Sequence, residues 1–308
     1  MDFFFPGKSL DDNFVFNPIV GPISSLTIED LEITFVIEKA LLYGASVWGG
    51  ALTKQQVDRL HSIQRIFLLK FTRAYRTTST NVLNSLTGIP PPLHVVAKTE
   101  FIKFQIWAGH ANLYTDILGN IQLDNNISIK NIPSSSKFVI LNENISKTDF
   151  EVYTDGSRIE DETGFAVCIL QENNNIENHL YKLKSHNSVF QAELAAMHCA
   201  ANWAASKNVS INIHTDSLSS IAAIKSASAR SSFVNNMKQD LVKIKHLVDL
   251  SWVKGIQGNE LADQQAKLAT TTGVDTIIPA PRSYVKRILN KLMIKEWNDY
   301  WRQYNSTS

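Results

Sequence analysis

The chain has 308 residues, of which 44% are hydrophobic and 19% charged, and this balance excludes an intrinsically disordered protein. The formal net charge is only +1, so a surface that binds a polyanion would have to come from local basic clusters. The start of the chain lacks a signal-peptide pattern, and Glu38 and Lys39 interrupt the nearest approach to a membrane-spanning run, so we expect an intracellular protein (cytoplasm or nucleus) that is neither secreted nor transmembrane.

The first 149 residues divide into three predicted segments. Residues 1–25 are rich in Phe, Pro, Asn and Gly without a clear period, and we expect them to be irregular. Residues 26–118 have a helical pattern, in which an apolar stripe recurs at three- and four-residue steps through Leu60, Ile63, Phe67 and Phe71. Residues 119–149 are rich in Asn, Ser and Ile and are predicted to be a linker.

Three basic residues, Lys70, Arg73 and Arg76, are interleaved with Phe71 and Tyr75 near the end of one predicted helix. Basic side chains contact phosphates and aromatic rings stack on bases, so this cluster is a candidate nucleic-acid-binding segment. A solvated helix face is the alternative interpretation.

From residue 150 onward, strands alternate with helices. Strands are predicted at 150–157, 164–170, 179–184, 210–215 and 248–253, and helices at 188–206, 217–227, 230–247 and 258–271. The later strand–helix–strand units imply right-handed crossovers and parallel pairing. We therefore expect an α/β domain over residues 150–272, with a mixed five-stranded sheet flanked by helices and preceded by the all-helical region. Residues 273–308 are expected to be a tail with a C-terminal helix.

Four acidic residues lie where such a domain would bring them together. Asp155 and Asp216 each follow an alternating strand pattern that ends in Thr-Asp, whereas Glu193 lies in an Ala-rich helical stretch and Asp263 near the start of another helix. Crowded carboxylates repel one another, and bound divalent cations are the usual remedy. Taken singly, the four have ordinary alternatives as a turn residue, a helix N-cap, a solvated helix residue and a first-turn acid.

The sequence around these acids resembles a type 1 ribonuclease H domain, and more narrowly the one at the end of the reverse-transcriptase polyprotein of non-LTR retrotransposons. Four motifs carry the resemblance in the family's order: Tyr153-Thr-Asp-Gly-Ser157, Gln191-Ala-Glu-Leu194, Thr215-Asp-Ser217 and Gly258-Asn-Glu-Leu-Ala-Asp263. The resemblance implies an endonuclease that hydrolyses the RNA strand of an RNA–DNA hybrid. It also implies two Mg²⁺ ions, with Mn²⁺ as a substitute, and no small-molecule cofactor.

The same resemblance assigns roles to individual residues. Asp155 would bridge the two ions, Glu193 and Asp216 would bind mainly one of them, and Asp263 the other. Gln191 and Asn259 would contact the hybrid. The oligomeric state stays open.

The helical region has a resemblance of its own, to the segment between the polymerase and the ribonuclease H domain of those polyproteins. It rests on four stretches: Leu42-Tyr-Gly-Ala-Ser-Val-Trp-Gly49, Ile63-Gln-Arg65, Ala74-Tyr-Arg-Thr-Thr78 and Leu86-Thr-Gly-Ile-Pro90. The polymerase signature Tyr-x-Asp-Asp is absent from the chain. We therefore expect no DNA synthesis.

One departure from the family concerns a loop that normally carries a histidine before the last helix. Here Trp252-Val-Lys254 leads directly to Gly255-Ile-Gln-Gly258, about three residues short of the family pattern, and no histidine follows His246. We expect this loss to weaken the enzyme. A catalytically decayed nucleic-acid-binding remnant and a non-functional retrotransposon fragment are the alternatives.

Overall fold

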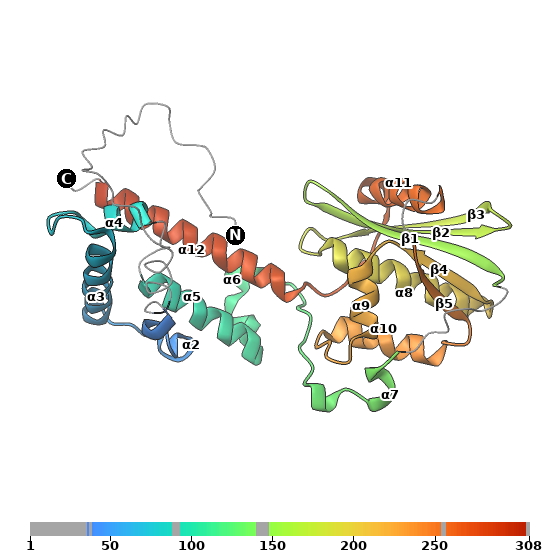
Figure 1. The fold of residues 1–308 in the computed structure, drawn as a ribbon, viewed down its shortest axis with the longest axis horizontal. Coiled ribbons are helices and arrows are strands. Elements are labelled where there is room, and N and C mark those ends of the chain that lie inside the picture. Colours follow the sequence, from blue (N-terminus) through green and yellow to red (C-terminus); the bar gives the residue numbers. More distant parts are fainter. Residues whose placement is uncertain (1–35, 37–38, 88–92, 140–147, 254–256, 306–308) are drawn as a thin grey trace, which may run out of the picture. The chain divides into compact units, whose positions relative to one another are not determined.

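The computed structural model describes residues 36, 39–87, 93–139, 148–253 and 257–305. They form two compact units, one containing Met1–Gly119 and Val285–Ser308 and the other Asn120–Tyr284. We call them the helical unit and the sheet unit (Figure 1). The segment 1–25 and the start of the expected helical region lie outside the described residues.

A mixed, six-stranded sheet organises the sheet unit, in the order β5-β4-β1-β2-β3-β6. Its strands are β1 (Phe150–Ile159), β2 (Glu162–Gln171), β3 (Asn174–Leu183), β4 (Ile211–Thr215), β5 (Val248–Trp252) and β6 (Val274–Asp275). The first three pair antiparallel, whereas β4 lies parallel to β1 and β5 parallel to β4. The predicted fold class is thereby confirmed, with one correction. The sheet has six strands and not five, because the two residues of β6 pair with β3.

The sheet unit has four longer helices: α8 (Val189–Lys207), α9 (Leu218–Lys225), α10 (Ser232–Lys243) and α11 (Gln257–Thr272). Figure 1 shows α8, α9 and α10 on one face of the sheet and α11 on the other. Helix α8 begins with a capping box, in which the Ser188 hydroxyl accepts from the Gln191 backbone N–H and the Gln191 side chain accepts from the Ser188 N–H. It ends at Asn208, whose left-handed backbone (φ 54°) stops the helix.

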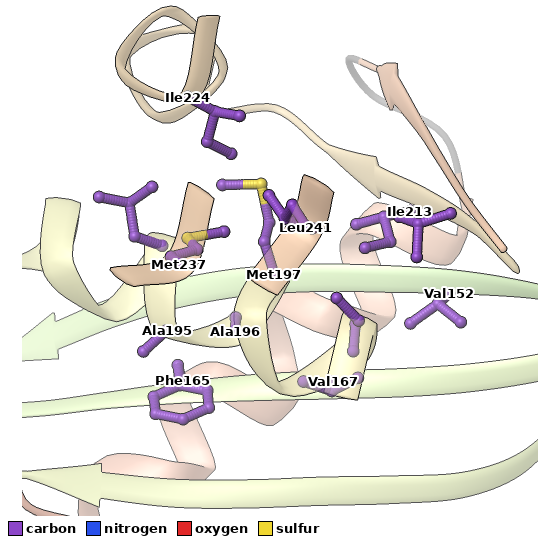
Figure 2. Packing of buried hydrophobic residues seen from close by; sticks show 14 of the residues in the cluster. Val152, Phe165, Val167, Ala195, Ala196, Met197, Ile213, Ile224, Met237 and Leu241 are labelled. Carbon is purple, nitrogen blue, oxygen red and sulfur yellow. The ribbon is translucent and has the colours of Figure 1, made fainter. Parts of the chain in front are cut away.

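The main core lies between the sheet and the α8 face. Phe165 and Val167 of β2 and Val152 of β1 point toward the small side chains of α8, and α10 covers the far side of α8 with Met237 and Leu241 (Figure 2). Four of these five side chains are no more than 2% exposed, and Phe165 is 3% exposed. Each such burial contributes about 1.5–3 kcal/mol, so this layer is a major source of the stability that holds α8 against the sheet.

The expected linker, residues 119–149, contributes contacts to the sheet unit as far as it is described. Leu123 forms a bridge with Ala280. The buried ammonium of Lys238 donates to the Lys137 carbonyl at 2.8 Å. Residues 140–147 lie outside the described part of the chain.

The helical unit contains α2 (Ala45–Trp48), α3 (Lys54–Thr72), α4 (Thr80–Thr87), α5 (Leu93–Gln105), α6 (Thr115–Leu118) and most of α12 (Arg282–Asn305). Helix α5 stops at Gln105 and is followed by a π-helical turn over Ile106–His110, in which Gly109 has φ 101°. The predicted stripe on α3 is also corrected, because Ile63 is 36% exposed and the buried residues of α3 are Gln64 and Leu68. Gln64 faces inward since its amide bonds to Asn84 and to the backbone of α5.

None of the helices in the described ranges combines the length and the apolar character that crossing a bilayer requires.

Candidate active site

Strand β1 places Asp155 at the centre of the acidic cluster. The residue is only 9% exposed. Burial raises the pKa of Asp155 to about 7; a hydrogen bond from the Gly156 backbone N–H opposes this rise, and the carboxylates of Asp216, Asp263 and Glu193 add to it. The structure therefore places Asp155 within electrostatic reach of each of the other three acids.

Gly156 explains how Glu193 comes so close to Asp155. A Cβ atom at Gly156 would lie 2.7 Å from the backbone nitrogen of Glu193 and 2.8 Å from the Cβ of Ala192. Any side chain larger than hydrogen would push α8 away from β1. The Thr-Asp-Gly sequence thus supplies both the carboxylate and the space for the helix that carries the second one.

Two further glycines allow α11, which carries Asp263, to pack closely on the face of the sheet opposite α8. A Cβ at Gly164 would lie 2.7 Å from the Thr270 nitrogen, and a Cβ at Gly258 would lie 2.3 Å from the ring of Tyr153. The end and the beginning of α11 are therefore both in close contact with the sheet.

Two serine hydroxyls hold the Glu193 carboxylate. Ser217 and Ser220 both donate to Glu193 Oε2, the latter at 3.0 Å. Ser217 is also the N-cap of α9, where it accepts from the Ser220 backbone N–H at 3.3 Å. The start of α9 therefore fixes the orientation of an acid on α8.

Asp216, directly after β4, is held by α11 and β5. The Asn259 side-chain amide donates to Asp216 Oδ2 at 3.2 Å, and the Trp252 indole donates to the Asp216 carbonyl at 3.1 Å. Asn259 is only 7% exposed. The structure thus places Asn259, predicted to contact the hybrid, behind Asp216 as a positioning residue.

Gln191, the other predicted contact to the hybrid, is 3% exposed. Its amide donates to the Pro279 carbonyl at 2.8 Å and accepts from Asn187 at 3.2 Å. These bonds and the capping box engage the Gln191 side chain within the protein. The basic residues Lys70, Arg73 and Arg76 belong to the helical unit.

Asp263 has a cationic neighbour on its own helix. The Lys267 ammonium lies 2.7 Å from Asp263 Oδ2. Sequence reasoning missed Lys267, Ser217 and Ser220. The i,i+4 spacing on a helix was the available signal for the lysine, and the N-cap position after Asp216 was the signal for Ser217.

The chemistry of the donor set fits a divalent cation. All four side chains supply carboxylate oxygens, the ligands that Mg²⁺ and Mn²⁺ prefer, and the raised pKa of Asp155 shows that its surroundings disfavour uncompensated negative charge. In the part of the chain that the structure describes, no group of three or more His, Cys, Asp or Glu side chains is already arranged to hold a metal ion. The side chains would therefore have to adjust when an ion binds.

Comparison with known proteins identifies the class of the domain. The model of the RNase H family matches residues 147–271, so this part of the chain is a ribonuclease H domain. No curated protein sequence matches the chain significantly.

Among solved structures, the native prototype foamy virus protease–reverse transcriptase is 18% identical with a TM-score of 0.38, and the match covers 42% of this chain and 22% of that one. The foamy viral protease–reverse transcriptase in complex with dsDNA is 21% identical with a TM-score of 0.36, and the match covers 42% of this chain and 98% of that one. LC11-RNase H1, isolated from compost by a metagenomic approach, is 15% identical with a TM-score of 0.34, and the match covers 40% of this chain and 96% of that one.

Proposed function

We propose that the sheet unit is a metal-dependent endonuclease of the type 1 ribonuclease H kind, which hydrolyses the RNA strand of RNA–DNA hybrids. The observation that carries the proposal is the match of residues 147–271 to the RNase H family. The close approach of α8 to β1 at Gly156 and the nearness of Asp216, Asp263 and Glu193 to Asp155 support it. The resemblance of the helical region, in the stretches 42–49, 63–65, 74–78 and 86–90, supports a further part of the proposal, that the chain derives from the C-terminal region of a non-LTR retrotransposon polyprotein.

Asp155, Glu193, Asp216 and Asp263 are the residues that would hold two divalent cations, Mg²⁺ or Mn²⁺. Such cations, when bound, supply activation of the attacking water and neutralisation of charge at the phosphate and the leaving 3′ oxygen.

The protein's own contribution is to hold the four carboxylates in place. Ser217 and Ser220 fix Glu193, and Asn259 fixes Asp216. Asp155 is buried on β1, against which both α8 and α11 pack. Because a buried carboxylate has little water to solvate its charge, a bound cation would stabilise its ionised form. Recognition of the hybrid would rest on its shape and on 2′-hydroxyl groups, with little base specificity.

The shortened loop before α11 is the reason to propose a weakened enzyme. Residues 254–256 of this loop lie outside the described residues, but α11 begins at Gln257 and presents Asp263 to Asp155. The loss of a general acid or base typically costs about 10²–10⁴-fold, whereas the metals supply much of the remaining acceleration. A decayed domain that binds nucleic acid without cutting it is the second candidate function, favoured by the missing histidine.

A cleavage assay separates these two functions. A hybrid with end-labelled RNA is incubated with the full chain and Mg²⁺ or Mn²⁺, beside single-stranded and double-stranded RNA of the same sequence. We expect slow cleavage of the RNA strand in the hybrid alone, reduced at least about 100-fold by Asp155→Asn. Cleavage that Asp155→Asn leaves unchanged, or hybrid binding without cleavage, would contradict the nuclease proposal.

A further inference from the structure

The helical unit contains a long sequence stretch with basic residues and no acidic ones. Residues 59–99 have no Asp or Glu but six basic residues: Arg59, Arg65, Lys70, Arg73, Arg76 and Lys98. The whole chain has a formal net charge of only +1. A local excess of this kind attracts a polyanion.

Part of this charge lies on one exposed face of α3. Arg59, Ile63, Ile66 and Lys70 follow one another at steps of four and three residues, which places them on the same side of the helix. All four are exposed. The face leads directly into the loop 73–79, which we call the basic loop.

Hydrogen bonds from within the helical unit hold the basic loop in its conformation. The Arg65 guanidinium donates to the Thr78 carbonyl at 2.6 Å, to the Thr80 hydroxyl at 3.2 Å and to the Arg76 carbonyl. Within the loop, the Thr78 N–H donates to the Tyr75 carbonyl at 2.9 Å. Arg65 thus stabilises the loop from inside, whereas Arg73 and Arg76 of the loop are exposed.

The loop displays an aromatic ring between two exposed arginines. Tyr75 is 85% exposed, and Arg73 and Arg76 on either side are exposed as well. Arg73 has a left-handed backbone conformation with φ 51°, which costs a non-glycine residue about 1–3 kcal/mol and turns the chain sharply at the end of α3. An unfavourable backbone conformation at Arg73 and a solvent-exposed aromatic ring at Tyr75 thus lie two residues apart in the same loop.

We propose that the basic loop and the end of α3 form a binding site for single-stranded nucleic acid. Tyr75 stacks on an unpaired base, and Lys70, Arg73 and Arg76 neutralise the flanking phosphates. A single strand fits better than a duplex because the bases of a duplex are already stacked and leave no face for the ring. The site lies in the helical unit and does not depend on the proposed nuclease activity.

The stacking part is tested by fluorescence anisotropy with labelled 20-nucleotide oligo(U) and oligo(dT), the full chain and EDTA, which prevents metal-dependent cleavage. We expect Tyr75→Ala to weaken single-strand binding about tenfold and Tyr75→Phe to stay within about twofold of wild type. Tyr43→Ala is the matched control, because Tyr43 is 87% exposed in the same unit and should leave affinity unchanged. Equal loss with Tyr75→Phe, or equal loss for duplex DNA of the same length, would overturn stacking on unpaired bases.

The electrostatic part is tested by the salt dependence of the same binding. Arg73→Gln combined with Arg76→Gln should reduce the slope of log affinity against log salt by about 1.4, since each phosphate contact on a single strand contributes about 0.7. The control, Lys207→Gln with Lys245→Gln, removes two exposed charges from the sheet unit. The proposal is overturned if both double variants lose the same slope, or if wild type binds neither oligonucleotide at low salt. Thermal melting should show all these surface variants folded like wild type.

Discussion

The Lys267 ammonium lies 2.7 Å from the Asp263 carboxylate, one turn further along α11. Its hydrogen bond with Asp263, and then the charges of Asp263 and Asp155, raise the pKa of Lys267. The chain thus places a cation of its own at the edge of the acidic cluster. A divalent ion that binds Asp263 has to compete with this lysine.

Removing the lysine should make the metal bind more easily. We expect Lys267→Gln to lower the Mg²⁺ concentration that gives half-maximal cleavage by about two- to fivefold, in line with the strength of an exposed ion pair. Lys243→Gln is the matched control, since Lys243 pairs with Asp240 at 2.8 Å on α10. A Mg²⁺ titration with the labelled hybrid measures both variants. An unchanged or higher requirement in Lys267→Gln would show that the lysine does not compete.

The raised pKa of Asp155 predicts how stability depends on pH in the absence of metal. Between about pH 4 and 7 the folded protein binds more protons at this site than the unfolded chain, so the free energy of unfolding falls as pH rises through that window. The total effect is on the order of a few kcal/mol.

Melting in EDTA should therefore show wild type losing stability from pH 5 to pH 8, and Asp155→Asn losing less. Mg²⁺ at pH 8 should restore wild type more than the variant. Identical pH profiles for the two proteins would contradict the assigned environment of Asp155.

The serine pair at the start of α9 should affect cleavage through Glu193. Ser220→Ala removes one of the two hydroxyls that bond Glu193 Oε2, and a hydrogen bond to a charged group is typically worth about 1.5–3 kcal/mol. We expect cleavage to fall about tenfold with little change in KM for the hybrid. Ser206→Ala, on the exposed end of α8, serves as the control. A variant that cuts at the wild-type rate would show that Ser217 alone is sufficient.

The close approach of α8 and β1 can be tested at Gly156. In Gly156→Ala the new methyl group would meet the Glu193 nitrogen at 2.7 Å, so the helix or the strand has to move. We expect a loss of about 1–3 kcal/mol in the free energy of unfolding and a larger proportional loss of cleavage, because Asp155 and Glu193 separate. Urea denaturation and the hybrid assay give the two values. Wild-type activity in a folded Gly156→Ala protein would show that the close approach at Gly156 is not needed for cleavage.

Local sequence patterns predicted most elements of the sheet unit within a few residues, because strand alternation, the Ala-rich run and the helix caps are all short-range features. β3 was predicted to begin at residue 179, but it begins at Asn174. Its first residues are polar, and the turn before it, at Glu172 and Asn173, has positive φ at both positions (51° and 64°), as a tight hairpin requires. β6 was missed because two residues are too short for any periodicity.

The parts of the site that depend on tertiary packing were harder to predict. Motif order indicated the four acids, but not that Asn259 would bond Asp216 or that Gln191 would be enclosed by the segment around Pro279. Both are contacts between residues far apart in the sequence, which local patterns do not determine. On α3, Ile63 belongs to the predicted apolar stripe but is 36% exposed, whereas Gln64 faces inward because its side-chain amide bonds to Asn84 and to the backbone of α5.

The shortened loop between β5 and α11 leads to the last prediction. β5 ends at Trp252 and α11 begins at Gln257, and the chain has no histidine after His246. Inserting Ala-His-Val after Lys254 restores the length and the imidazole of the family pattern. A well-placed general acid or base contributes about 10²–10⁴-fold, so we expect single-turnover cleavage of the hybrid to rise by at least about tenfold.

The matched control is an insertion of Ala-Ala-Val at the same position, which restores the length without the imidazole. A gain only with the histidine would assign the weakness of the enzyme to proton transfer or product release. Equal gains with both insertions would instead indicate that the short connection strains the start of α11 and displaces Asp263. If neither insertion variant cuts faster than wild type, the loop does not limit cleavage, and the proposal that the short loop weakens the enzyme is wrong.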